Sequence, residues 1–184
     1  MSNANDRWIQ TYRAAATGTY PGGVEAASDR QETKQVMRRA ISELRRVLPD
    51  QPTRSIALWL TVTSLPEVRQ AASVLAYTSL RGEPDSAPFV AWCHESGKRV
   101  AFPEDDPLPD PATFDLVIVP GVAFTERGAR LGRGGGWYDR LLPQLRADCA
   151  TVGVAFDIQV LPELPVEPHD VPVDVVVTET HTYP

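Results

Sequence analysis

The chain has 184 residues and a formal net charge of −6 at pH 7, with the 42% hydrophobic and 23% charged residues of an ordinary globular protein. This length suits one well-buried domain, and the two cysteines, Cys93 and Cys149, fit neither a disulfide framework nor a zinc site. The acidic balance and the absence of a long apolar run argue against nucleic-acid and membrane partners, so the sequence predicts a cytoplasmic protein.

The N-terminal part of the sequence divides into an extension and a helix. Residues 1–28 are small and polar, and we interpret them as an extension of a single domain that covers residues 29–184. A helix is predicted over residues 29–47, because apolar residues recur at helical spacing from Val36 to Leu44 and Pro49 marks the stop. The segment 55–62 is compatible with a helix or a buried strand.

The remaining sequence alternates between strand and helix patterns. Strands are predicted over 73–79, 99–102, 114–119, 151–156 and 173–177, helices over 86–96 and 137–146, and a loop over 104–111. Pro143 is expected to bend or restart the last of these helices. The continuous apolar run at 114–119 is typical of a strand covered on both faces. The alternation predicts an α/β fold, a mostly parallel sheet with helices on both faces in three α/β/α layers.

A glycine-rich segment follows the clearest strand and precedes a helix, and its sequence over residues 128–140 is GARLGRGGGWYDR. Glycines bring main-chain amides close to an anion, and a helix start adds unpaired N–H donors. Arg130 and Arg133 supply forked donors that match phosphate oxygens. Together these features predict a loop that binds nucleotide phosphates, the alternative being a flexible surface loop. The spacing matches neither a Walker A loop nor a dinucleotide fingerprint.

The same segment carries a family resemblance. VPGVAF at 119–124, followed by the motif at 128–140, resembles the signature of the 5-formyltetrahydrofolate cyclo-ligase family, also called methenyltetrahydrofolate synthetase. VGVAFDIQ at 152–159 and LPVEPHD at 164–170 resemble its C-terminal pattern, and YTSLRGE at 77–83 resembles its substrate loop. The resemblance spans roughly residues 30–180.

The resemblance implies a reaction without a protein nucleophile. In this family ATP phosphorylates the formyl oxygen on N5 of the reduced folate. N10 then attacks the activated carbon, and phosphate leaves to give 5,10-methenyltetrahydrofolate and ADP. The expected cofactors are ATP and Mg²⁺, and the expected partners are these small molecules, with the protein a monomer or weak dimer. Such chemistry needs alignment and charge neutralisation.

The resemblance also implies an ATP site. Lys34 and Arg38 on the first helix would contact ATP, although a solvated basic helix face is the alternative. The glycine-rich segment would wrap the triphosphate, and Arg133 would also reach the transferring phosphoryl group as the catalytic residue. The expected ATP contacts in this segment are Arg130, Leu131, Gly132, Arg133, Gly134, Gly135, Gly136, Trp137 and Tyr138.

Carboxylates are expected to hold the metal and the folate. Asp139 and Asp170 would bind Mg²⁺, the alternatives being a first-turn helix carboxylate and a loop cap. Glu83 would bind the pterin end of the substrate beside Thr78, unless it is only a turn residue before Pro84. His169 is expected to fix the loop that carries Asp170.

One segment departs from the family pattern. Family members carry a long segment between the strand that ends near Pro103 and the strand that begins near Asp115, whereas only residues 104–114 connect them here. Three interpretations remain open: a cyclo-ligase with a more open folate pocket, a paralogue that uses ATP on another small substrate, or a non-catalytic nucleotide-binding protein. Retention of the basic and acidic residues of the ATP site argues against the third.

Overall fold

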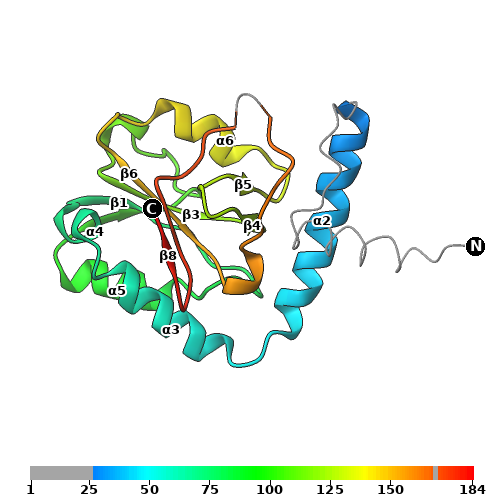
Figure 1. The fold of residues 1–184 in the computed structure, drawn as a ribbon. Helices are drawn as coiled ribbons and strands as arrows, with labels where there is room; N and C mark the ends of the chain where they lie inside the picture. Colours follow the sequence, from blue (N-terminus) through cyan, green and yellow to red (C-terminus); the bar gives the residue numbers. More distant parts are fainter. Residues whose placement is uncertain (1–26, 168–169) are drawn as a thin grey trace, which may run out of the picture.

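The computed structural model describes residues 27–167 and 170–184, so His169 and nearly all of the predicted extension 1–28 lie outside the described residues. A six-stranded sheet forms the centre of the domain (Figure 1). Its strand order is β2 (Arg99–Ala101), β1 (Ser73–Leu75), β3 (Leu116–Pro120), β6 (Ala150–Val154), β7 (Val175–Val177) and β8 (Thr182–Tyr183). All neighbouring pairs are parallel except β7 and β8, which confirms the mostly parallel sheet.

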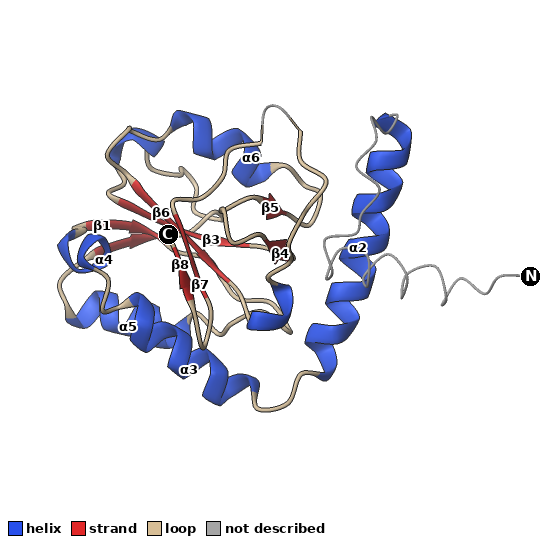
Figure 2. Ribbon diagram, in the orientation of Figure 1, coloured by secondary structure: helices blue, strands red, loops and turns tan. Residues whose placement is uncertain are grey.

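Helices cover both faces of the sheet (Figure 2). On one face lie α3 (Gln51–Val62), α4 (Pro66–Gln70) and α5 (Ala87–Glu95), whose apolar side chains share a buried cluster with Leu116 and Ile118 of β3. On the other face α6 (Trp137–Leu141) contributes Leu141 to a cluster with Val117 and Val119. Successive side chains of a strand point to opposite faces, so β3 is buried on both sides and the three-layer prediction is confirmed.

The first helix, α2 (Ala27–Val47), packs on a small hairpin and stands to one side of the sheet. The hairpin pairs β4 (Ala123–Phe124) with β5 (Arg130–Leu131) in an antiparallel register. Met37 and Ile41 of α2 lie in a buried cluster with Leu131. This contact brings the basic residues of α2 against the glycine-rich segment.

Several elements differ from the prediction. The segment 55–62 belongs to helix α3, and the strand predicted over 73–79 ends at Leu75. The helix predicted over 137–146 is wrong in length, because α6 ends at Leu141 and a 3₁₀ turn, Leu142–Gln144, contains Pro143, which lacks an N–H donor. The hairpin, helix α4 and strand β8 were not predicted. Among the described residues, no helix is both long and apolar enough to cross a bilayer.

Candidate functional site

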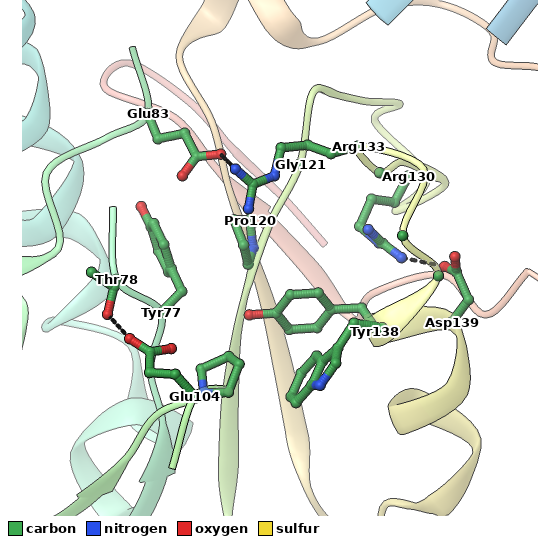
Figure 3. A pocket seen from close by; sticks show the side chains of 15 residues that line it. Tyr77, Thr78, Glu83, Glu104, Pro120, Gly121, Arg130, Arg133, Tyr138 and Asp139 are labelled. Atoms are coloured by element: carbon green, nitrogen blue, oxygen red, sulfur yellow. Dashed lines mark hydrogen bonds and ion pairs between the residues drawn. The ribbon is translucent and has the colours of Figure 1, made fainter. Parts of the chain in front are cut away.

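A cavity of about 270 Å³ opens where the central parallel strands end (Figure 3). Thr78 follows β1, Glu104 follows β2, and Gly121 follows β3, and all three line the cavity. Ligands of open α/β sheets bind outside the carboxyl ends of the strands. The glycine-rich segment forms the opposite wall, with lining residues Arg130, Gly132, Arg133, Gly135, Gly136, Trp137, Tyr138 and Asp139.

The glycine-rich segment is held in place by the first helix. Arg38 Nε donates to the carbonyl oxygen of Gly132 at 2.7 Å. Gly134 and Gly136 adopt φ values of 107° and 65°, a conformation that favours glycine. Because α6 has only five residues, a bound anion would depend on the loop amides and arginines more than on a helix dipole.

Arg130 is a buried cation that is paired with the carboxylate of Asp139. Its guanidinium binds Asp139 through Nη2 and lies over the Tyr138 ring at 5.5 Å, and only 6% of its side chain is exposed. Burial lowers the pKa of Arg130, while Asp139, Tyr138 and Asp170 act to raise it. Its Nε has no hydrogen-bond partner in the described part of the chain. A buried guanidinium with unused donors is suited to an additional anion.

Arg133, in contrast, is largely free to move toward a ligand. Its side chain is 58% exposed, and its Nη1 lies 3.9 Å from Glu83 Oε1. The Glu83 side chain is only 4% exposed and accepts a hydrogen bond from the Leu80 amide at 3.0 Å. Glu83 is thus fixed and buried, whereas Arg133 bridges the glycine-rich wall and the carboxylate wall of the cavity.

Five residues that were predicted to contact ATP or Mg²⁺ do not line this cavity. The ammonium of Lys34 lies 2.8 Å from Glu167 Oε1 and 3.7 Å from Asp170 Oδ2. The Leu131 side chain is buried against α2, so only its main chain is available to a ligand. Arg38, Lys34, Asp170, Leu131 and Gly134 are not among the residues that line the cavity.

Both predicted metal ligands lie near Arg130. Asp139 is bound to it directly, and Asp170 is near enough to affect its pKa. Among residues 27–167 and 170–184, no three His, Cys, Asp or Glu side chains are grouped closely enough to form a metal site by themselves. Mg²⁺, however, is often held by one or two carboxylates together with phosphates and water, so this donor set fits a metal that arrives with a nucleotide.

Two further polar groups point into the cavity, one from Glu104, which the sequence analysis did not single out, and one from Tyr138, which it expected to contact ATP. Glu104 accepts a hydrogen bond from the Thr78 hydroxyl. The cavity is therefore lined by a second carboxylate in addition to that of Glu83. The Tyr138 hydroxyl is buried without a partner among the described residues, and burial raises its pKa. Glu104 could have been found from its position three residues after the end of β2, as Thr78 lies three residues after the end of the neighbouring strand β1.

Both thiols are buried outside this cavity. Burial raises the pKa of Cys93 and of Cys149 to about 11 in each case. Such thiols stay protonated near neutral pH and are weak nucleophiles.

Comparison with known proteins finds relatives in one family of enzymes. A model of the 5-formyltetrahydrofolate cyclo-ligase family matches residues 104–179. The 5-formyltetrahydrofolate cyclo-ligase of Escherichia coli (strain K12) is 32% identical over 152 residues, covering 64% of this chain and 84% of the relative. The cyclo-ligase of Mycolicibacterium smegmatis is 29% identical, covering 79% of this chain and 93% of the relative.

Solved structures lead to the same group. The 5,10-methenyltetrahydrofolate synthetase of Aquifex aeolicus has a TM-score of 0.70 at 30% identity, covering 81% of this chain and 91% of its own. The synthetase of Mycoplasma pneumoniae has a TM-score of 0.71 at 22% identity, covering 79% and 98%. The alignment with the Escherichia coli relative spans 152 positions but only 64% of the 184 residues here, so part of that relative has no counterpart in this chain.

Proposed function

This chain belongs to the 5-formyltetrahydrofolate cyclo-ligase family, a family of enzymes, and we propose that it converts 5-formyltetrahydrofolate to 5,10-methenyltetrahydrofolate with ATP and Mg²⁺, releasing ADP and phosphate. The observation that supports this best is the cavity between the glycine-rich segment and the buried Glu83, with Arg133 reaching toward both walls.

ATP is proposed to lie along the glycine-rich wall. The loop amides and Arg130 would hold its phosphates, while Arg38 keeps the loop in place and Lys34 adds positive charge beside Asp170. Mg²⁺ would be held by Asp139 and Asp170, where it would neutralise phosphate charge. Binding of the metal to Asp139 would leave Arg130 donors available for phosphate oxygens.

The reacting atoms belong to the two substrates. The formyl oxygen attacks the terminal phosphorus of ATP, the bond to ADP breaks, and the formyl carbon becomes electrophilic. The N10 lone pair then attacks this carbon, N10 loses its proton, and phosphate leaves with the former formyl oxygen. Arg133 is the proposed catalytic residue, because its exposed guanidinium can follow the negative charge during phosphoryl transfer.

The pterin end is proposed to bind at the carboxylate wall. Glu83, held in a fixed orientation by the Leu80 amide, can accept hydrogen bonds from the amino and ring N–H groups of a pterin. The Thr78 and Glu104 pair lies at the same wall, and the Tyr138 hydroxyl is available to donate.

We expect Glu83→Gln to raise the KM for 5-formyltetrahydrofolate about tenfold, since one charge-assisted hydrogen bond is replaced by a neutral one. Glutamine can still accept from the Leu80 amide, so the fold should be retained. Steady-state kinetics, with each substrate varied at a saturating concentration of the other, would measure this change, with Glu126→Gln on the exposed hairpin turn as the control. An unchanged folate KM with a raised ATP KM would assign Glu83 to the nucleotide instead.

Asp170→Asn is expected to raise the Mg²⁺ concentration needed for half-maximal activity by roughly tenfold, because a charged oxygen ligand becomes neutral. A Mg²⁺ titration of activity would test this, compared with Asp148→Asn at a carboxylate that is 78% exposed and outside the cavity. A titration identical to that of the parent protein would remove Asp170 from the metal site.

The decisive experiment for the function is an assay of methenyltetrahydrofolate absorbance with 5-formyltetrahydrofolate, ATP and Mg²⁺. A signal that depends on both ATP and the folate is the expected result. The short connection between Ala101 and Leu116 favours one alternative, an ATP-using paralogue with another small substrate. Folded protein that binds ATP without producing the signal would favour that paralogue, and loss of ATP binding as well would leave a non-catalytic protein.

A further inference from the structure

Glu83 is a buried carboxylate that lines two adjoining cavities. One is the cavity at the glycine-rich segment, and the other, of about 520 Å³, is also lined by Arg45, Arg46, Arg81 and Arg133. The Glu83 side chain is only 4% exposed, and its ion pair with Arg133 has a distance of 3.9 Å (Figure 3). A carboxylate that is removed from water needs a cation close by to remain charged.

Arg133 is not suited to be the permanent partner of Glu83. Its side chain is 58% exposed, and in the proposed reaction its guanidinium moves toward the phosphates. The carboxylate of Glu83 then loses this ion pair at the stage when it has to hold the pterin. A second cation, fixed near Glu83, would keep the carboxylate charged throughout the reaction.

Arg45 of α2 has the position that such a fixed cation requires. The residue is 5% exposed, and its Nη1 donates to the Gly121 carbonyl oxygen at 3.2 Å. The same oxygen accepts a hydrogen bond from Gln159 Nε2 at 3.0 Å, so the group that anchors the guanidinium is itself held in place. The loop that carries Glu83 lies against Arg45, because a β-carbon on Gly82 would be 3.7 Å from the Arg45 β-carbon.

The charges of Arg45 and Glu83 act on each other. Burial lowers the pKa of Arg45, and of its neighbouring charges in the described part of the chain Glu83 has the largest effect, which raises it. The other two arginines from α2 and the Glu83 loop fit less well, because Arg46 is exposed and pairs with Glu43 at 2.8 Å, and Arg81 is exposed. Since Arg45 and Glu83 are both removed from water, each lowers the cost of burying the other.

We infer that Arg45 is a positioning residue, a fixed counter-charge that keeps Glu83 ionised and directed at the pterin while Arg133 moves to the phosphates. The inference rests on the proposed function, in which Glu83 accepts hydrogen bonds from the pterin. Arg45 does not line the cavity at the glycine-rich segment, so it acts through Glu83. Without Arg45, a proton would neutralise the buried carboxylate, which could then accept fewer hydrogen bonds.

A double-mutant cycle measured by steady-state kinetics tests this inference. We expect Arg45→Met to raise the KM for 5-formyltetrahydrofolate about tenfold and the KM for ATP less than about twofold. In Glu83→Gln, which has no charge to neutralise, adding Arg45→Met should change the folate KM less than about twofold. Arg45→Lys retains the charge and should stay within about threefold of the parent protein. Arg46→Met, at the exposed neighbour of Arg45, should change neither KM.

The possible outcomes separate this inference from the proposed function. The same rise in folate KM in the parent protein and in Glu83→Gln would mean that Arg45 acts independently of Glu83, and the inference would fail while the proposed reaction stands. A parallel rise in both KM values would also overturn it and assign Arg45 a structural role.

Stability provides a second measurement if Arg45→Met does not fold. A double variant with Glu83→Gln that folds would support the pairing of the two charges, because removing one partner of a buried pair costs more than removing both. Loss of the fold in both backgrounds would overturn the inference. If the folded parent protein does not convert 5-formyltetrahydrofolate, the proposed function and this inference both fail.

Discussion

Arg133→Ala is expected to lower kcat/KM for ATP by roughly a hundredfold to a thousandfold while the free energy of unfolding changes by less than about 0.5 kcal/mol. The reason for the small stability effect is that the side chain is 58% exposed and its nearest carboxylate, Glu83, lies 3.9 Å away. The reason for the large kinetic effect is that phosphoryl transfer depends on positive charge placed at the transferring group.

Arg127→Ala provides a matched control for this prediction. Arg127 is exposed on the turn between β4 and β5 and does not line the cavity at the glycine-rich segment. Its replacement by alanine removes one positive charge, as Arg133→Ala does. Steady-state kinetics and urea denaturation of both variants would be compared. A loss of stability that parallels the loss of activity in Arg133→Ala would assign this arginine a structural role, and unchanged kinetics would exclude it from the reaction.

The contrast between Arg130 and Arg133 illustrates what the sequence could not predict. Both arginines were expected to bind phosphates, since they lie in one short motif. Only the tertiary structure shows that Arg130 is buried against Asp139 and Tyr138 while Arg133 is exposed. Replacement of Arg130 would therefore combine a loss of folding energy with a loss of activity, and Arg133 is the cleaner test of catalysis.

The sheet was predictable where apolar runs are long. The run at 114–119 identified β3 within two residues, because a strand buried on both faces requires consecutive apolar side chains. The hairpin of β4 and β5 was missed because strands of two residues are too short to show a period. Its effect on the site is large, since this hairpin places the glycine-rich segment against α2.

A cavity beside Glu83 that Arg45, Arg46 and Arg81 line was also beyond sequence analysis. Arg45, Arg46 and Arg81 belong to segments about 35 residues apart, and only the packing of α2 beside the loop after β1 brings them together. In the sequence, Arg45 and Arg46 are indistinguishable members of a basic helix face. The structure separates them, because Arg45 is buried and Arg46 is exposed and paired with Glu43.

Gly128→Ala should be the most destabilising single-methyl change in the hairpin, with an expected loss of about 3 kcal/mol. Gly128 has a φ of 78°, and a β-carbon there would lie 2.1 Å from the Val173 carbonyl oxygen. Its own carbonyl oxygen accepts a hydrogen bond from the Val173 amide at 3.0 Å. This close approach joins the hairpin to the segment that precedes β7, and a methyl group would separate them.

Gly97→Ala isolates the conformational part of that cost. Gly97 has a similar φ of 71°, but a β-carbon there would meet no atom within 4 Å, so we expect a loss of only about 1 kcal/mol. Urea denaturation would measure the free energy of unfolding of both variants, and the difference between them gives the cost of separating the two backbones.

Because Asp170 precedes Val173 by three residues, Gly128→Ala should also raise the Mg²⁺ requirement of the remaining folded enzyme. If Gly128→Ala were as stable as Gly97→Ala, the contact with Val173 would not constrain the hairpin. The position of Asp170 relative to the glycine-rich segment would then depend on other contacts.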